Sequence, residues 1–546
     1  VACAPVLSAS LSCSVTTPGA CGGTIVMYLE NDTGGNVNAH AQDVSIATYG
    51  NVVCCTPTGD TLSLSCSDQI YGALSATDNA HFEQNDQGNY AVDQCLTATT
   101  NHIVCDYSST GCGAFDTCLF SYASSDGANV TNSHVATCAE YAFDVCCTLN
   151  DQPTIGTPTL SATSAFNLTR DNLTVTLGAV SDDESDAVTN TTDWRIEGTS
   201  LAVLNLPLDI DVASNSTNNS ITDYSSYDVA GYLGNNTAVN SYPSWQNSDC
   251  VLGGCYDFDG TNDNIAFKSM TNFPTTEITV SMWVKTTNSG EGMFSYSSNT
   301  VTDNEFLIFE ANSLTVFVNN VNVNLGVNVN DGSWQHITVT WRSSDGNVSA
   351  YLDGVYQASS TLSQGHVMDA SGCLILGEEQ DSLCGGFVTS QAFGGSIDEV
   401  LVFDRVLSAN QIAQIYADQS AGIPLSTVVT DETAVGENWT VVVTPNDRYQ
   451  QGVPSTSNEV TILEESLTVA YVDPTPANDT RQVGNAVTIN VTATSFGNTI
   501  DTCTLDWNGV NETMTRVGSG ASVSCFTDKT PTDGTTYTYR VWVNDS

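Results

Sequence analysis

The chain has 546 residues, enough for about three to five domains with cores of ordinary size. Only 13% of the residues are charged, and 61 Asp and Glu against 11 Lys and Arg give a formal net charge of −50. A surface so poor in bases repels nucleic acid and anionic lipid and attracts divalent cations, so neither nucleic acid nor an anionic membrane is an expected partner.

Nineteen cysteines indicate an oxidising, extracellular compartment. The odd total leaves at least one thiol free or bonded to another chain. No run of about eighteen apolar residues predicts a membrane-spanning helix, and the chain opens at Val1 without a signal peptide. We therefore expect an extracellular, cell-surface protein whose leader has been removed or lies upstream of this segment.

A motif of Asn-x-His, Tyr and Cys occurs three times within residues 1–150. The copies begin at Asn38, Asn79 and Asn132, a Tyr stands five residues before a Cys in each, and three of the six histidines fall in the motif. This periodicity predicts three β repeats of roughly forty to fifty residues.

Two of the repeats end in cysteine doublets, Cys54-Cys55 and Cys146-Cys147. Neighbouring strand residues point to opposite faces, so each doublet is predicted to bond two different partners. Metal binding by His and Cys is the alternative, but no C-x-x-C pair with zinc-site spacing occurs, which favours a disulfide framework. The histidines are then expected to hydrogen-bond within their own turns.

Residues 151–207 read as the first half of an Ig-like sandwich, with alternating strands, an acidic loop and a strand that carries Trp194. Residues 421–464, with Trp439 on a strand, read as the second half. The block 208–420 is therefore predicted to be an insert in a split domain, which costs little where the ends of the insert lie close together.

The insert contains strand and turn signals in series. Alternating apolar and polar residues predict strands around an Asp-Gly turn at 256–267 and along 277–286. Residues 333–359 predict a three-stranded meander whose second turn is Asp353-Gly354. The segment 393–418 predicts a strand and then a short helix capped by Ser408.

The order FDG, W-x-H, YLDG and G-x-IDEV-x-x-F-D-R-x-LS resembles the laminin-G-like family, whose members have a concanavalin-type jelly roll. The W-R-x-x-G-T-S and T-P-N-D segments that flank it resemble parts of multi-modular archaeal cell-surface proteins. The fold class predicted for the whole chain is all-β, a modular array of small β-sandwiches with one laminin-G-like jelly roll.

Calcium is the cofactor that this resemblance implies, because calcium often lies near such loops in laminin-G-like relatives. The candidate ligands are the carboxylates of the FDG turn and of the IDEV strand, with an acidic loop as a second candidate site. Hard oxygen ligands on a loop suit calcium, although the same residues could simply cap turns. The candidates are Asp257, Asp259, Asp263, Asp398 and Glu399, and Asp182, Asp183 and Asp186 in the loop.

Residues 465–546 are predicted to be another Ig-like domain that lacks its last strand. Either the chain continues past Ser546, or another subunit supplies the strand. Outside the repeats, local cysteine pairs could close short loops: Cys250 with Cys255, Cys373 with Cys384, and Cys503 with Cys525.

Fourteen N-x-S/T sequons make N-glycosylation a further candidate modification. Thirteen of them are the candidate sites, namely Asn31, Asn129, Asn167, Asn172, Asn190, Asn215, Asn218, Asn235, Asn347, Asn438, Asn478, Asn490 and Asn511.

No catalytic motif occurs, and Glu378, Glu379 and Asp381 are expected to form a solvated turn, so we predict that the protein is not an enzyme. The first functional hypothesis is a structural subunit of a cell-surface filament or coat, whose partners are copies of itself in a polymer. The alternative is a carbohydrate-binding adhesin that binds glycans on exposed aromatic residues, for which Trp341, Tyr351 and Tyr356 are candidates.

Overall fold

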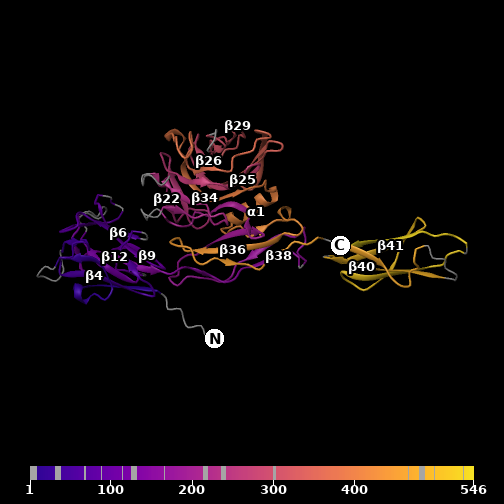
Figure 1. The fold of residues 1–546 in the computed structure, drawn as a ribbon, viewed down its shortest axis with the longest axis horizontal. Coiled ribbons are helices and arrows are strands. Elements are labelled where there is room, and N and C mark those ends of the chain that lie inside the picture. Colours follow the sequence, from indigo (N-terminus) through magenta and orange to yellow (C-terminus); the bar gives the residue numbers. More distant parts are fainter. Residues whose placement is uncertain are drawn as a thin grey trace.

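The computed structural model describes the chain except residues 1–8, 31–38, 67–68, 86, 88, 114, 124–131, 165, 213–218, 235–240, 299–302, 465, 479–485, 497, 533 and 546. Figure 1 shows an N-terminal module, a middle part of two packed β units, and a separate C-terminal domain. Strands dominate throughout, and the described residues include one α-helix, α1 (Ala409–Ser420), together with three short 3₁₀ turns (Pro18–Ala20, Thr389–Gln391 and Thr430–Glu432). The predicted all-β class is confirmed.

The N-terminal module consists of three four-stranded antiparallel sheets, one for each repeat. In every sheet the spatial order is first, fourth, second and third strand of the repeat. The strands, in that order, are β1 (Ser10–Thr16), β4 (Asn51–Thr58), β2 (Thr24–Leu29) and β3 (Ala41–Gln42); β5 (Leu62–Ser63), β8 (Val92–Ala98), β6 (Gln69–Leu74) and β7 (Phe82–Glu83); and β9 (His102–Ser108), β12 (Phe143–Asn150), β10 (Thr117–Tyr122) and β11 (Val135–Ala136).

Disulfides link the strands within each repeat. Each cysteine doublet bonds two different partners, because its two side chains leave opposite faces of β4 or β12. The bonds of the module are Cys13–Cys55, Cys21–Cys54, Cys66–Cys95, Cys105–Cys147, Cys112–Cys146 and Cys118–Cys138. Cys3 lies outside the described residues.

A small β-sandwich follows, built from segments on both sides of the jelly roll. Strand β17 pairs with β36 from Thr189 opposite Asn446 to Ile196 opposite Trp439. The sandwich has three sheets. The five-stranded sheet contains β18 (Thr199–Ser200), β17 (Thr189–Ile196), β36 (Asn438–Asn446), β37 (Ser455–Thr456) and β38 (Val460–Thr461), and the three-stranded sheet contains β14 (Thr159–Ala162), β15 (Leu173–Thr176) and β35 (Thr427–Val428). The third is the pair β13 (Thr154–Ile155) and β16 (Val180–Ser181).

The jelly roll has two eight-stranded antiparallel sheets. The first contains β22 (Ser244–Gln246), β23 (Cys255–Asp259), β34 (Gly394–Phe403), β25 (Glu277–Thr286), β30 (Gln335–Arg342), β31 (Asn347–Leu352) and β32 (Val355–Thr361), with β19 (Ala202–Leu206) paired to β34. The second contains β20 (Ser220–Ile221), β21 (Gly231–Leu233), β24 (Ile265–Met270), β33 (Gly372–Leu376), β26 (Gly292–Ser298), β27 (Phe306–Phe309), β28 (Thr315–Val318) and β29 (Val321–Asn324).

Helix α1 joins the jelly roll to the sandwich. Ser408 caps it, because the Ser408 side chain accepts a hydrogen bond from the Gln411 amide. Ile412 and Ile415 are buried in one core with Trp194 and Trp439 of the sandwich, and this core also includes apolar residues of β34. The two units therefore share a hydrophobic core, and a change in that core should be felt in both of them.

The C-terminal domain has two facing sheets and its own core around Ile489, Leu505 and the Cys503–Cys525 disulfide. The sheets are β39 (Ser466–Tyr471), β40 (Val487–Phe496), β44 (Ser522–Lys529) and β43 (Thr515–Val517); and β42 (Val510–Thr513), β41 (Ile500–Trp507) and β45 (Tyr539–Asp545). The described residues contain no helix with the length and apolar character that a membrane crossing requires.

Candidate functional site

Carboxylates gather at one end of the second jelly-roll sheet, where β24 begins and β33 ends. These two strands are neighbours, with Ile265 opposite Leu376. The turn before β24 carries Asp263 and Asn264, and the segment after β33 carries Glu378 and Glu379. We call Asp259, Asp263, Asn264, Glu378 and Glu379 the acidic edge.

Backbone hydrogen bonds fix the turn that leads into β24. The Asp259 side chain accepts hydrogen bonds from the amides of Thr261 and Asn262, at 2.7 and 3.3 Å. Asp263 accepts one from the Asp259 amide at 2.8 Å. Asp257 lies on β23, where its carboxylate accepts a hydrogen bond from Ser396 on the neighbouring strand β34. Two of the three candidate ligands in the FDG turn therefore belong to the acidic edge.

The glutamates after β33 are buried, so the expectation of a solvated turn is wrong for them. Glu378 and Glu379 are 1% and 3% exposed, whereas Asp381 is exposed. The Cys373–Cys384 disulfide closes this segment. Gln380, fully buried beside the glutamates, donates to the Ser295 carbonyl at 2.7 Å and accepts from the Cys384 amide at 2.9 Å. The segment is thereby folded back over the sheet, an effect that residue pattern alone did not reveal.

Three buried oxygens of the acidic edge have no hydrogen-bond partner, namely Asn264 Oδ1, Glu378 Oε2 and Glu379 Oε2. Buried acceptors are rarely left unpaired, and each such atom needs an explanation. No ion pair between described residues involves these carboxylates. Carboxylate and amide oxygens without a compensating base are the donor types that suit a hard divalent cation such as calcium.

Burial and mutual repulsion raise the carboxyl pKa values at this edge. Burial, together with the charges of Asp259, Glu379 and Asp263, raises the pKa of Glu378 to about 8. Burial, with the charges of Asp381 and Asp303, raises the pKa of Glu379 to about 7. The pKa of Asp263 rises to about 6, again mainly through burial. Negative charge is thus costly here unless a cation accompanies it.

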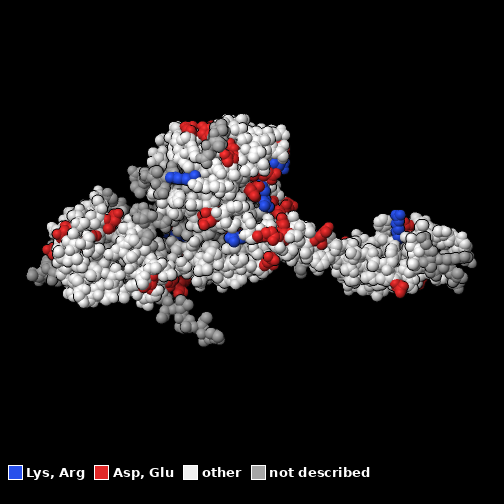
Figure 2. All heavy atoms as spheres, in the orientation of Figure 1, with Lys and Arg blue, Asp and Glu red and all other residues white. Residues whose placement is uncertain are grey.

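The charge on the rest of the surface would also attract a cation to the protein. Figure 2 shows acidic side chains at many positions on the visible face and very few Lys and Arg. The field of the whole protein therefore favours the approach of cations.

The IDEV carboxylates lie apart from the acidic edge. Asp398 stands four positions along β34 from Gly394, the residue that pairs with Asp259. Its carboxylate accepts hydrogen bonds from the amides of Val251 and Leu252. Burial raises the pKa of Asp398 and of Glu399 well above the usual range, and the charge of Asp209 adds to both shifts. Asp398 and Glu399 thus belong to a second, deeply buried carboxylate group.

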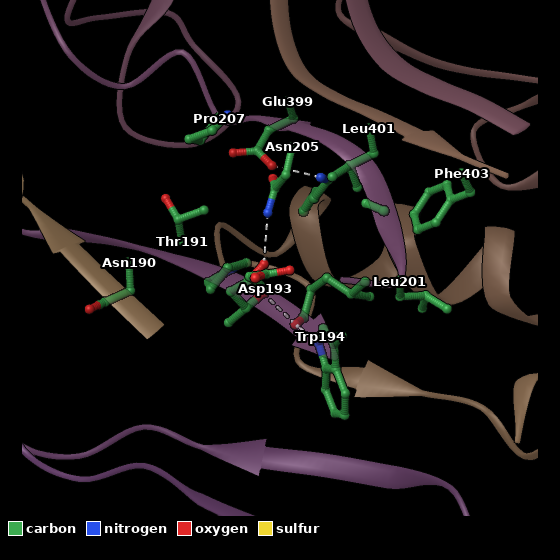
Figure 3. A pocket seen from close by; sticks show the side chains of 15 residues that line it. Asn190, Thr191, Asp193, Trp194, Leu201, Asn205, Pro207, Glu399, Leu401 and Phe403 are labelled. Carbon is green, nitrogen blue, oxygen red and sulfur yellow. Dashed lines mark hydrogen bonds between the residues drawn. The ribbon is translucent and has the colours of Figure 1, made fainter. Parts of the chain in front are cut away.

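Glu399 also lines a cavity of about 20 Å³ between the jelly roll and the sandwich (Figure 3). Asn205 and Asp193 contribute further polar atoms to its wall, and Trp194 and Phe403 contribute apolar ones. A space of this size holds about one water molecule. The cavity is therefore a place for a structural water beside the orphaned Glu399 Oε1 and Asp193 Oδ1 atoms, and it is too small for a ligand.

The acidic loop packs at the junction with the N-terminal module. Asp182 accepts a hydrogen bond from the Asp186 amide at 2.9 Å, and Glu184 accepts one from the Asp151 amide at 3.1 Å. Burial raises the pKa of Glu184 to about 7. Asp183 lies in the same loop, and calcium binding by Asp182, Asp183 and Asp186 stays a prediction.

The aromatic candidates for sugar stacking do not form one surface. Trp341 is fully buried, and its indole donates to the Leu362 carbonyl at 2.8 Å. Tyr351 packs against the core shared by the jelly roll and the sandwich. Tyr356, on the edge strand β32, is 52% exposed.

Glycosylation of the sequons also stays a prediction. Asn478 and Asn511 are exposed, while Asn167, Asn172, Asn190, Asn347, Asn438 and Asn490 are half-buried. Asn31, Asn129, Asn215, Asn218 and Asn235 lie outside the described residues.

Residues 258–434 match the family model described as Pentaxin family. They form a pentraxin domain. Over 139 residues the chain is 37% identical to neuronal pentraxin-1 of Homo sapiens. This match covers 24% of this chain and 32% of that protein. Over 143 residues it is 36% identical to the "Sushi, von Willebrand factor type A, EGF and pentraxin domain-containing protein 1" of Rattus norvegicus, covering 25% of this chain and 4% of that protein.

The chain therefore spans less than a third of the length of either relative. A solved structure, the heptameric SAP-like pentraxin from Limulus polyphemus, is 20% identical, with 35% of this chain and 88% of that chain covered at a TM-score of 0.26.

These matches correct two expectations. A filament or coat subunit is wrong, because the pentraxin domain and its neuronal pentraxin relatives indicate a binding protein. An archaeal-type cell-surface protein with an Ig-like split domain has no support in the matches either. The prediction that the protein is not an enzyme is confirmed by the same matches, which are to non-enzymatic binding proteins.

Proposed function

We propose that this is an extracellular binding protein whose pentraxin domain binds carbohydrate through a calcium ion at the acidic edge. The observation that supports it best is the set of three buried oxygens without partners, at Asn264, Glu378 and Glu379. Together with Asp263 they would hold the ion by oxygen ligands alone.

The residues of the acidic edge suit this role for two reasons. The disulfide-closed segment 373–384 positions Glu378 and Glu379 before any ion arrives, which lowers the ordering cost of binding. Because calcium takes about six to eight oxygen ligands, positions remain for ligand hydroxyl groups. Neutral sugars with neighbouring hydroxyls fit this edge better than anions do, since the surrounding protein is strongly acidic.

Glycan-array binding with calcium and with EDTA tests the proposal. We expect neutral glycans to bind in calcium, and the signal to disappear in EDTA and in a Glu378→Gln variant. Glu459→Gln removes an exposed acid from the sandwich and serves as the matched control, with binding retained. Glycan binding that persists in EDTA, or calcium binding without any glycan bound, would contradict the proposed function.

A further inference from the structure

Three histidines, one from each repeat, converge in the N-terminal module. The ring centroids of His40, His81 and His134 are 4.8 to 4.9 Å apart. One ring nitrogen from each lies within 4.8 Å of the other two, and all three side chains are half-buried. The prediction that the histidines hydrogen-bond within their own turns is wrong for His40 and His81, whose rings bond asparagines of the next repeat.

A closed cycle of backbone pairs brings the histidines together. Each repeat is joined to the next by an antiparallel bridge with two hydrogen bonds of 2.9 to 3.0 Å. The bridges are Ala41 with Ala80, Phe82 with Ser133, and Val135 with Ala39. Every histidine therefore stands between two bridging residues.

The bridging residues also decide which way the histidines face. All six are at most 2% exposed, so their side chains point into the module. Because successive side chains of an extended strand point to opposite faces, the intervening histidines share the outer face. The Asn-x-His motif is thus placed three times around one axis.

The asparagines of the motif orient the rings across the repeats. His40 Nδ1 bonds Asn79 Oδ1, and His81 Nδ1 bonds Asn132 Oδ1. An amide oxygen only accepts, so Nδ1 carries the proton and Nε2 is left with its lone pair, the form that ligates metals. Asn79 and Asn132 both have left-handed backbones, with φ of 51° and 59°. The equivalent Asn38 lies outside the described residues.

We propose that His40, His81 and His134 bind a zinc-type transition-metal ion. Given the 4.8 Å limit on the nitrogen separations, some point lies within about 2.8 Å of all three atoms, against about 2.0 to 2.1 Å for a Zn–N bond, so each ring needs to move by less than about 1 Å. Three imidazoles leave a fourth position open to water or an external ligand, because the group lies at the surface.

The chemistry of this site differs from that of the acidic edge. Imidazole nitrogen suits zinc, copper and nickel, whereas carboxylate and amide oxygens suit calcium. The asparagine bonds supply the outer-shell support that metal-binding histidines usually have. Glu30 adds a carboxylate oxygen 3.9 Å from His40 Nδ1 and so contributes negative charge beside the site.

A second group of potential metal ligands in the module contains cysteines that already form disulfides. Cys112, Cys118 and Asp144 lie close together, but Cys112 is bonded to Cys146 and Cys118 to Cys138. A disulfide sulfur is not a thiolate ligand. The histidine triad is therefore the site to test in the oxidised protein.

The experiment is a zinc chloride titration, by calorimetry, of the EDTA-treated and dialysed full chain in excess calcium chloride. We expect one zinc equivalent to bind, and binding to be lost in His81→Ala. Asn79→Ala, which keeps all three ligands, is expected to bind about 10- to 100-fold more weakly. His366→Gln removes a histidine of the jelly roll and is the control, with zinc binding unchanged.

Cobalt(II) provides a second measurement that depends on ligand identity. Wild type with cobalt should show visible absorption of a nitrogen-ligated ion, and His81→Ala should not. If His81→Ala folds poorly, the cobalt spectrum of the wild type and the zinc affinity of Asn79→Ala still test whether the histidines bind the metal. Absence of zinc binding by the wild type, or zinc affinity unchanged in both the His81 and Asn79 variants, overturns the proposal.

Discussion

Replacing Glu378 by Gln should stabilise the pentraxin domain in EDTA. With a folded pKa of about 8 against an ordinary value of 4.5, Glu378 stays protonated in the fold at pH 7 while the unfolded chain ionises it. Keeping that proton costs the folded state up to about 3 kcal/mol at pH 7. Gln has the same shape and no charge to suppress. Because water and side-chain relaxation screen part of the effect, we expect a gain of about 1 to 2 kcal/mol.

The same substitution should have the opposite consequence in calcium. Wild type gains about 2.7 kcal/mol when calcium is present at about 100 times its dissociation constant. Glu378→Gln loses a charged ligand, so most of that gain should disappear. The sign of the difference from wild type therefore reverses between EDTA and calcium, which a merely structural glutamate would not produce.

Scanning calorimetry of the full chain at pH 6, 7 and 8 measures this, with Glu459→Gln as the control. For a domain of this size, 1 kcal/mol corresponds to about 2 to 4 °C in the transition temperature. Because the folded pKa lies above the unfolded one, the stability that the carboxyl contributes is complete below the ordinary pKa of 4.5 and is lost as pH rises from there to about 8. In EDTA the wild-type transition should therefore rise as pH falls from 8 to 6. A variant less stable than wild type in EDTA at pH 8, or one that calcium stabilises fully, refutes the reasoning.

Three further predictions concern the scaffold. Cys13→Ser with Cys55→Ser opens a link between residues 42 apart and should cost the N-terminal module about 4 kcal/mol of unfolding free energy in guanidinium titrations, with the pentraxin transition unchanged. Trp439→Ala should cost about 3 to 5 kcal/mol and lower the calorimetric transitions of sandwich and jelly roll together, since they share the core that contains Trp439. Ser408→Ala removes the α1 cap and should cost about 1 kcal/mol in the same scans, and no loss would show the cap to be unimportant.

Local patterns predicted much of the fold, and long-range packing decided the site. Alternation and turn residues indicated the jelly-roll strands, and Ser408 with Ile412 and Ile415 indicated α1. Only part of the acidic edge could be predicted from the sequence. Asp259 and Asp263 were predicted because they lie beside a recognisable Asp-Gly turn. Glu378 and Glu379 looked solvated since a polar run after a strand usually is, and only the disulfide and Gln380 fold that run inward.

The histidine triad shows the same limit in a different form. The sequence contained the three-fold Asn-x-His motif, and this correctly marked the residues as special. The sequence did not show how the repeats pair with one another. An asparagine two residues before a histidine suggests a local hydrogen bond, yet Asn79 bonds His40, which lies 39 residues earlier in the chain. In this module the asparagine that bonds His40 or His81 therefore lies in the next copy of the motif.

Two cation sites of different chemistry would suit a chain with a net charge of −50. A cation at the acidic edge removes the repulsion that raises the pKa values there, so ligand binding and domain stability become linked through one ion. The triad consists of neutral nitrogen donors and gains little from calcium, so the two sites should fill independently. Zinc that left the calcium-induced rise of the pentraxin transition unchanged, while stabilising the N-terminal module, would separate the two sites within one protein.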